Sequence, residues 1–101
     1  MPDSSPLLPL AVIQSTLGSP TRWAILRELA DGGSLMVSEL AKRIGGSPSA
    51  ISKQLAILIA DGLVINPRGR LFEIPERFLA DKANRTLDFG WCLLHMNVTQ
   101  S

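Results

Sequence analysis

The chain has little of what redox, metal and nucleophilic chemistry require. Its 101 residues include one cysteine, one histidine and no tyrosine. A single cysteine makes neither an internal disulfide nor a cysteine-rich zinc site, so a reducing, cytoplasmic setting is expected. Paired carboxylates, a histidine beside a nucleophile and a phosphate-binding glycine loop are also absent from the sequence. We therefore expect a protein that is not an enzyme.

Long apolar runs are absent as well. The apolar run over residues 7–13 is interrupted by Pro9 and has no cationic residue before it, so we expect neither a signal peptide nor a membrane span. Residues 1–6 contain two prolines and two serines and are predicted to be a flexible tail. The length of the chain fits one domain.

Helical spacing of apolar residues predicts four helices, over residues 9–17, 21–31, 37–44 and 48–60. The dipeptides Ser19-Pro20 and Ser47-Pro48 each combine a helix-capping serine with a proline at the first helical position. The last helix has an apolar stripe that is expected to face the core, made of Ile51, Leu55, Leu58 and Ile59. Its other face carries small side chains and one cation, namely Ser49, Ser52, Lys53 and Ala56.

The third and fourth predicted helices are joined by Gly45-Gly46-Ser47, and glycines at such a connection allow the chain to turn sharply. This arrangement predicts a helix-turn-helix, with a helical hairpin of a bundle as the alternative. Short hydroxyl donors and the amide of Gln54 suit a helix that lies in a DNA major groove, where acidic groups would be repelled. The fourth helix is therefore the expected recognition helix.

Positive charge is concentrated in and just after this unit. The net charge is +1, yet residues 42–70 contain five cationic residues and one acidic residue. A local basic face supplies the phosphate contacts on which nonspecific DNA affinity depends, while an ordinary solvated face is the alternative. Residues 63–66 and 70–74 flank Pro67-Arg68-Gly69 and predict a β-hairpin with Arg68 and Arg70 at its tip.

Three segments with fixed spacings fall within residues 17–74: LGSPTRWAILRELA, VSELAKRIGGSPSAISKQL, and DGLV followed by RGRLFEI. They resemble the ArsR-type winged helix-turn-helix repressors of prokaryotes. The resemblance implies a mainly α fold with a small β-hairpin as the wing, and a transcriptional regulator that binds operator DNA as a homodimer. Gln54 stands where that family often has histidine, so the preferred base sequence is expected to differ. The resemblance and the basic face together predict these DNA-binding residues: Lys42, Arg43, Ser47, Ser49, Ser52, Lys53, Gln54, Arg68 and Arg70.

A winged-helix module for protein assembly, without DNA binding, is the alternative function. The two functions differ in the basic face, because a protein-binding module has no need for Lys53, Arg68 and Arg70 to converge. The sequence names neither an operator nor an effector.

Metal sensing does not follow from the resemblance. Members of the family that bind soft metals place cysteines on the supporting helix, and SLMVSEL at residues 34–40 has none. The other candidate metal ligands are Asp88, Cys92 and His95. They would lie on one face, as a metal site requires, only if residues 85–96 formed a helix. We expect no metal and no cofactor.

The segment over residues 85–96 has two interpretations. Gly90 interrupts a helix, and apolar residues alternate at period two, which favours a strand after a turn at residues 81–84. A strand here departs from the resemblance, which implies a last helix. The helical alternative places Leu87, Trp91 and Leu94 on one face.

We expect a homodimer held by its two termini, because one small domain is not expected to bury its terminal apolar residues together with the helix-turn-helix core. A positive mean hydropathy of +0.20 also favours a partner surface. Residues 7–75 would form the winged helix-turn-helix domain, and residues 76–101 its C-terminal dimerisation segment. The expected dimer interface contains Leu7, Leu10, Ile13, Leu87, Phe89, Trp91 and Leu93.

Overall fold

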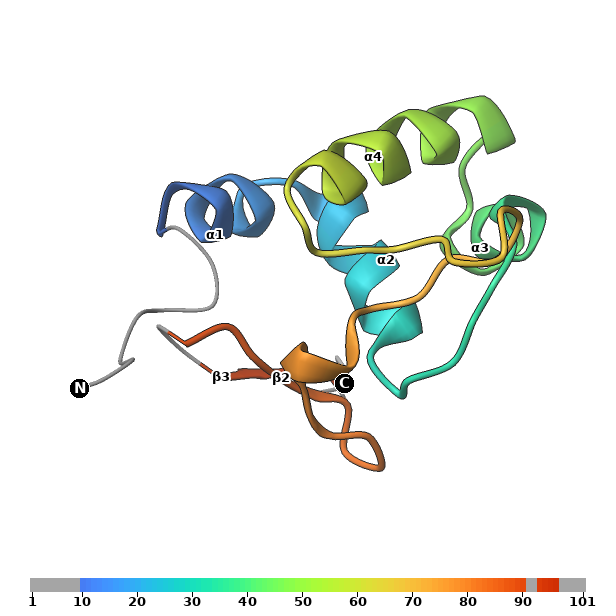
Figure 1. The fold of residues 1–101 in the computed structure, drawn as a ribbon. Helices are drawn as coiled ribbons and strands as arrows, with labels where there is room; N and C mark the ends of the chain where they lie inside the picture. Colours follow the sequence, from blue (N-terminus) through green and yellow to red (C-terminus); the bar gives the residue numbers. More distant parts are fainter. Residues whose placement is uncertain (1–9, 91–92, 97–101) are drawn as a thin grey trace.

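The computed structural model describes residues 10–90 and 93–96, with the side chain of Leu10 left out. Four helices come first: α1 (Leu10–Leu17), α2 (Pro20–Leu29), α3 (Val37–Ile44) and α4 (Pro48–Ala60). A short 3₁₀ turn, η1 (Glu76–Phe78), then leads into β1 (Leu79–Asp81), β2 (Thr86–Asp88) and β3 (Leu93–His95). In Figure 1, α4 lies on one side of α2 and the strands lie on the other. No helix within the described ranges combines the length and the hydrophobicity that crossing a bilayer requires.

The helix boundaries follow local capping signals. The Ser19 side chain accepts a hydrogen bond from the backbone N–H of Arg22, and the Ser47 side chain accepts one from Ala50, while a proline follows each serine at the first helical position. Helix α3 ends at Gly45, whose φ of 92° lies in the left-handed region that favours glycine. The four predicted helices are confirmed, although α2 ends at Leu29, two residues before the predicted end.

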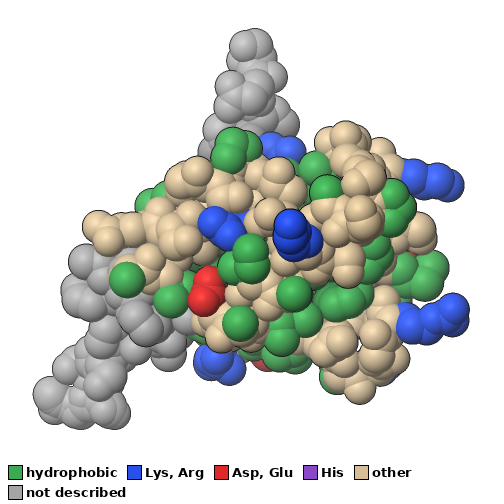
Figure 2. Space-filling model, turned by 90° about the horizontal axis from the view of Figure 1, so that it is seen from above, with side chains coloured by type: hydrophobic (Ala, Val, Ile, Leu, Met, Phe, Trp, Pro, Cys, Tyr) green, Lys and Arg blue, Asp and Glu red, His purple; other side chains and the backbone are tan. Residues whose placement is uncertain are grey.

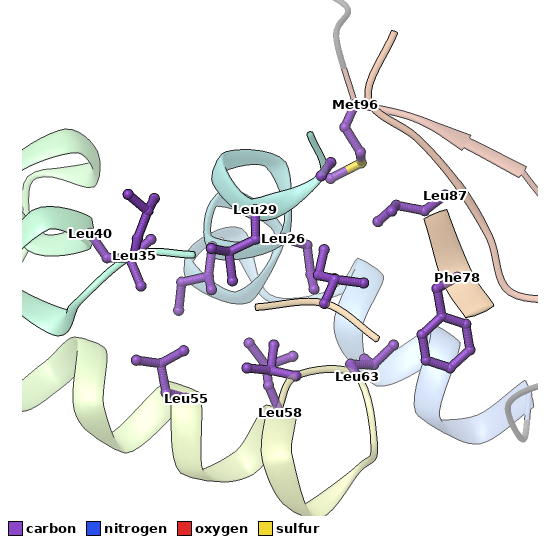
Figure 3. Packing of buried hydrophobic residues seen from close by; sticks show 14 of the residues in the cluster. Leu26, Leu29, Leu35, Leu40, Leu55, Leu58, Leu63, Phe78, Leu87 and Met96 are labelled. Atoms are coloured by element: carbon purple, nitrogen blue, oxygen red, sulfur yellow. The ribbon is translucent and has the colours of Figure 1, made fainter. Parts of the chain in front are cut away.

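One continuous core joins the helices to the sheet. Leu26 and Leu29 of α2 lie between the leucines of α4 and the side chains of the C-terminal segment (Figure 3). Phe78 and Phe89 are fully buried and meet edge to face, with ring centroids 5.5 Å apart. Burial of a side chain of this size contributes about 1.5–3 kcal/mol, so the C-terminal segment is a substantial part of the core.

The dimer surface was predicted because a single small domain was not expected to bury the apolar residues near its termini. For three of these residues that expectation is wrong. Ile13 is 2% exposed, and Leu87 and Phe89 are 0% exposed within a single chain, where all three side chains belong to the hydrophobic core. Leu93 differs, with 53% of its surface exposed. The remaining expected interface side chains, of Leu7, Leu10 and Trp91, lie outside the described part. The interface itself remains a prediction.

The C-terminal segment is extended, as predicted, but it is not one strand. Strands β1, β2 and β3 form an antiparallel sheet in that order, with Leu87 opposite Leu94. Gly90 has a φ of 90°, a conformation that glycine adopts without strain, and β3 runs back along β2 beyond it. This reversal removes Leu93 from the face that holds Leu87. The helical alternative for residues 85–96 is wrong.

The predicted hairpin over residues 63–74 pairs as expected but is short. Ile65 and Glu73 exchange backbone hydrogen bonds of 2.8 and 2.9 Å, and Gly69, with a φ of 77°, closes the turn. Phe72 pairs in turn with Leu35, just before α3. Each pairing is an isolated bridge, so the wing is a narrow loop held next to the start of α3.

Candidate nucleic-acid interface

Helix α4 has one buried face and one exposed face. Ile51, Leu55 and Leu58 are at most 1% exposed and pack in the core. The prediction that Ile59 joins them is wrong: it is 37% exposed, because it lies at the edge of the buried stripe in the last turn of α4. The opposite face is exposed and contains Ser49, Ser52, Lys53 and Ala56, as the sequence predicts. No acidic residue lies within α4.

The amino-terminal end of α4 is also open to solvent. Pro48 and Ser49 are exposed there, and Ser47 is exposed while its hydroxyl oxygen caps the helix at 3.2 Å from the Ala50 nitrogen. The partial positive charge of a helix amino terminus favours phosphate, so this end and the exposed face are both compatible with DNA. The hydroxyl hydrogen of Ser47 remains available as a donor.

The basic residues around α4 differ in how freely their charge is presented. Nη1 of Arg43 lies 3.5 Å from Oε1 of Glu28 on α2, and this carboxylate offsets part of the positive charge of Arg43. Lys42, Lys53, Arg68 and Arg70 are exposed, and none of them forms an ion pair with another described residue. Figure 2 looks down on α4, and Lys and Arg side chains outnumber acidic ones on that face.

The wing lies beside the first turn of α3. A shallow hollow of about 300 Å³ separates them, and its lining includes Met36 and Ser38 on one side with Arg70 and Phe72 on the other. Because the backbone of Phe72 is hydrogen-bonded to that of Leu35, the position of the wing arginines is tied to the start of α3. The basic tip of the wing is therefore tied to the start of α3, and α3 in turn packs against α4.

Residues 19–66 match the family model described as bacterial regulatory protein, arsR family. This stretch of the chain is therefore similar to the helix-turn-helix of the arsR family. One curated relative is the HTH-type transcriptional regulator NmtR of Mycobacterium tuberculosis, with 39% identity over 66 residues, which cover 65% of this chain and 54% of that protein. The chain thus spans about half the length of the curated relative. The matched segment contains α2, α3 and α4, which confirms the resemblance seen in the sequence.

Gln54 differs from the other predicted DNA contacts in its position on α4. It is half-buried on the flank of α4, and its side-chain oxygen accepts a hydrogen bond of 3.3 Å from Nη1 of Arg22. The sequence-based prediction did not include Arg22. One signal could have identified it: Arg22 falls at helical spacing with Ile25 and Leu29, so a cation lies on the buried side of α2.

The sequence also offered Asp88, Cys92 and His95 as a set that a helix would bring together. Asp88 and His95 do not share a helix face, because residues 86–88 and 93–95 are strands. Asp88 lies on β2 and His95 on β3, where Nδ1 of His95 is 3.5 Å from the Thr86 hydroxyl, and Cys92 is outside the described part. Across residues 10–90 and 93–96, no three His, Cys, Asp or Glu side chains are grouped closely enough to hold one metal ion.

Proposed function

We propose that this protein is a DNA-binding transcriptional regulator that inserts α4 into the major groove of a near-palindromic operator and acts as a homodimeric repressor. The observation that carries the proposal is the exposed face of α4, where small side chains and Lys53 stand opposite the buried Ile51, Leu55 and Leu58. A narrow, acid-free surface of this kind approaches base edges without steric or electrostatic penalty. The ArsR-family match supports the same assignment.

The candidate contacts fall into two groups. Ser49, Ser52 and Lys53 would reach base edges and the adjacent phosphates from α4, with Gln54 at the flank. Phosphates would be contacted by the residues at the edges of the interface, which are Lys42, Arg43, Ser47, Arg68 and Arg70. Phosphate contacts position the protein and supply salt-dependent affinity, whereas base contacts supply sequence preference.

Dimerisation is part of the proposal because one recognition helix reads only a short sequence, and two related by a twofold axis read half-sites about 34 Å apart. Exposed apolar side chains support a partner surface: Leu17 is 51% and Leu93 is 53% exposed. Beside Leu17 there is also an open hollow of about 460 Å³, lined in part by Trp23 and Arg27. The proposed action on DNA places the protein in the cytoplasm of a prokaryote.

The test is selection of bound sequences from random duplex DNA, followed by sedimentation of the protein with and without the selected site. We expect one enriched, near-palindromic sequence and two protomers on each duplex. The Leu17→Asp variant should sediment as a monomer and lose most affinity for the full site, because linked half-sites bind far more tightly than one. Repression is then measured with a promoter that contains the selected site.

A protein-assembly module is the second candidate, and one observation favours it. Ile57 and Ile59 on α4 are each 37% exposed, which provides apolar surface on the same helix. No enrichment of any sequence, together with a salt-independent failure to bind DNA, would reject the proposed function in favour of this one.

A further inference from the structure

Arg22 connects three helices at one point. From α2, its Nη1 donates to the side-chain oxygen of Gln54 on α4 at 3.3 Å. Its Nη2 lies 3.4 Å from the hydroxyl of Ser15 and 3.5 Å from the backbone oxygen of the same residue, on α1. The Nε atom of Arg22 is buried and has no hydrogen-bond partner among the described residues. The orientation of this guanidinium group therefore depends on the bonds to Gln54 and Ser15.

The bond to Gln54 determines which way its amide points. A guanidinium group has donors and no acceptor, so the Gln54 oxygen must face Arg22 and the NH₂ group must face away. Gln54 is half-buried, and its NH₂ group is neither a buried unsatisfied atom nor hydrogen-bonded to another described residue. Away from Arg22, Gln54 therefore presents the donors of its NH₂ group, while its oxygen, which keeps a second lone pair, is directed at Arg22.

This restriction matters for base recognition. A glutamine reads adenine through two bonds, for which its oxygen must accept from N6 while its NH₂ donates to N7. With the oxygen directed at Arg22, the amide meets a base with its NH₂ group. These donors match the N7 and O6 acceptors of guanine or the O4 acceptor of thymine, whereas at adenine they meet a single acceptor, N7, beside the N6 donor. We propose that Arg22 is a specificity-determining residue that acts through Gln54, so that Gln54 selects guanine or thymine and discriminates against adenine. The inference rests on the proposed DNA-binding function.

The experiment repeats the selection from random duplexes with the full chain and four variants. Gln54→Leu removes the amide and identifies the base position that Gln54 reads, as the position where the preference disappears. At that position, wild type should favour guanine or thymine over adenine by about fivefold, the lower end of what a good base contact provides. Arg22→Met has a side chain of similar length without hydrogen-bond donors. This variant should accept adenine at that position, because the amide of Gln54 is then free to turn. Arg22→Lys, whose ammonium also only donates, should keep the wild-type preference.

Thermal unfolding checks that each variant of Arg22 folds. Gln54→Glu provides a second test that does not depend on those variants, because it keeps a hydrogen-bond partner for Arg22. A carboxylate accepts and does not donate, so the preference at the same position should move to cytosine, whose N4 group is a donor. Four outcomes would each overturn the proposal. One is a wild-type site that contains adenine at this position. The others are a base preference that is unchanged in folded Arg22→Met, in Gln54→Glu or in Gln54→Leu. If wild type enriches no sequence, the proposed function fails and this inference fails with it, whereas an enriched site with any of those four outcomes rejects the inference alone.

Discussion

Arg85 holds the C-terminal sheet against the end of α2, and its replacement tests how strongly that contact stabilises the protein. Its Nη1 donates to the backbone oxygen of Arg27 at 2.7 Å, and its Nη2 lies 3.5 Å from a carboxylate oxygen of Asp31. The backbone oxygen of Arg85 accepts from Met96, just beyond β3. The same residue has a φ of 51°, a left-handed conformation that is unfavourable for any side chain with a Cβ.

The expected loss for Arg85→Ala follows from these contacts. A hydrogen bond from a charged donor is worth about 1.5–3 kcal/mol when buried, and the partly exposed ion pair adds at most about 1 kcal/mol. The side chains of Arg85 and Asp31 are 32% and 45% exposed, so solvent screening lowers both contributions. We expect a total loss of about 1–3 kcal/mol in the free energy of unfolding.

The backbone conformation supplies a matched control. Arg85→Gly loses the same contacts as Arg85→Ala but removes the left-handed strain, so it should be more stable than the alanine variant by about 0.5–1 kcal/mol. Equilibrium unfolding in urea at one fixed protein concentration measures both, since a linked dimer makes stability depend on concentration. An alanine variant within about 0.5 kcal/mol of wild type, or a glycine variant less stable than alanine, would refute the reasoning.

Three further predictions concern the interface and the pH dependence. Lys53→Ala should weaken binding to the selected site by about 1–3 kcal/mol and binding to random DNA by less, and equal losses measured by titration would reduce Lys53 to a phosphate contact. Arg68→Ala and Arg70→Ala should weaken binding to all sequences alike and make the salt dependence shallower by about 0.9 for each lost phosphate contact, so an unchanged slope places the wing off the DNA. Hydrogen bonds from Asn84 lower the pKa of Asp81 below its ordinary value of 3.8, so the stability that Asp81 contributes is present above pH 3.8 and is lost as the pH falls through the lower folded value. Urea unfolding over this range should be less acid-sensitive for Asp81→Asn, and identical pH profiles would contradict the assignment.

Much of the helix-turn-helix is predictable because its signals are local. Ser19 and Ser47 cap α2 and α4 within one turn of chain, and Gly45 ends α3 in a conformation that other residues avoid. The spacing of Ile51, Leu55 and Leu58 identifies the buried side of α4 without knowledge of what covers it. The exposed side, where the candidate base contacts lie, follows as its complement.

Contacts between distant parts of the chain are not predictable in this way. The pairing of Arg22 with Gln54 spans 32 residues, and only the packing of α2 against α4 brings the two side chains together. A period of two indicates that residues around Leu87 are extended, but it does not show that β3 runs back along β2 and leaves Leu93 exposed.

Sequence alone was enough to predict the four helices, the tight turn before α4 and the basic character of residues 42–70. Capping, glycine conformation and charge act over a few residues, so these features need no knowledge of the rest of the chain. The burial of Leu87 and Phe89 in the core and the hydrogen bond from Arg22 to Gln54 became known from the three-dimensional structure. Burial and side-chain pairing depend on which segments meet in space, and a hydrophobic pattern along the chain specifies that a face is covered without specifying by what.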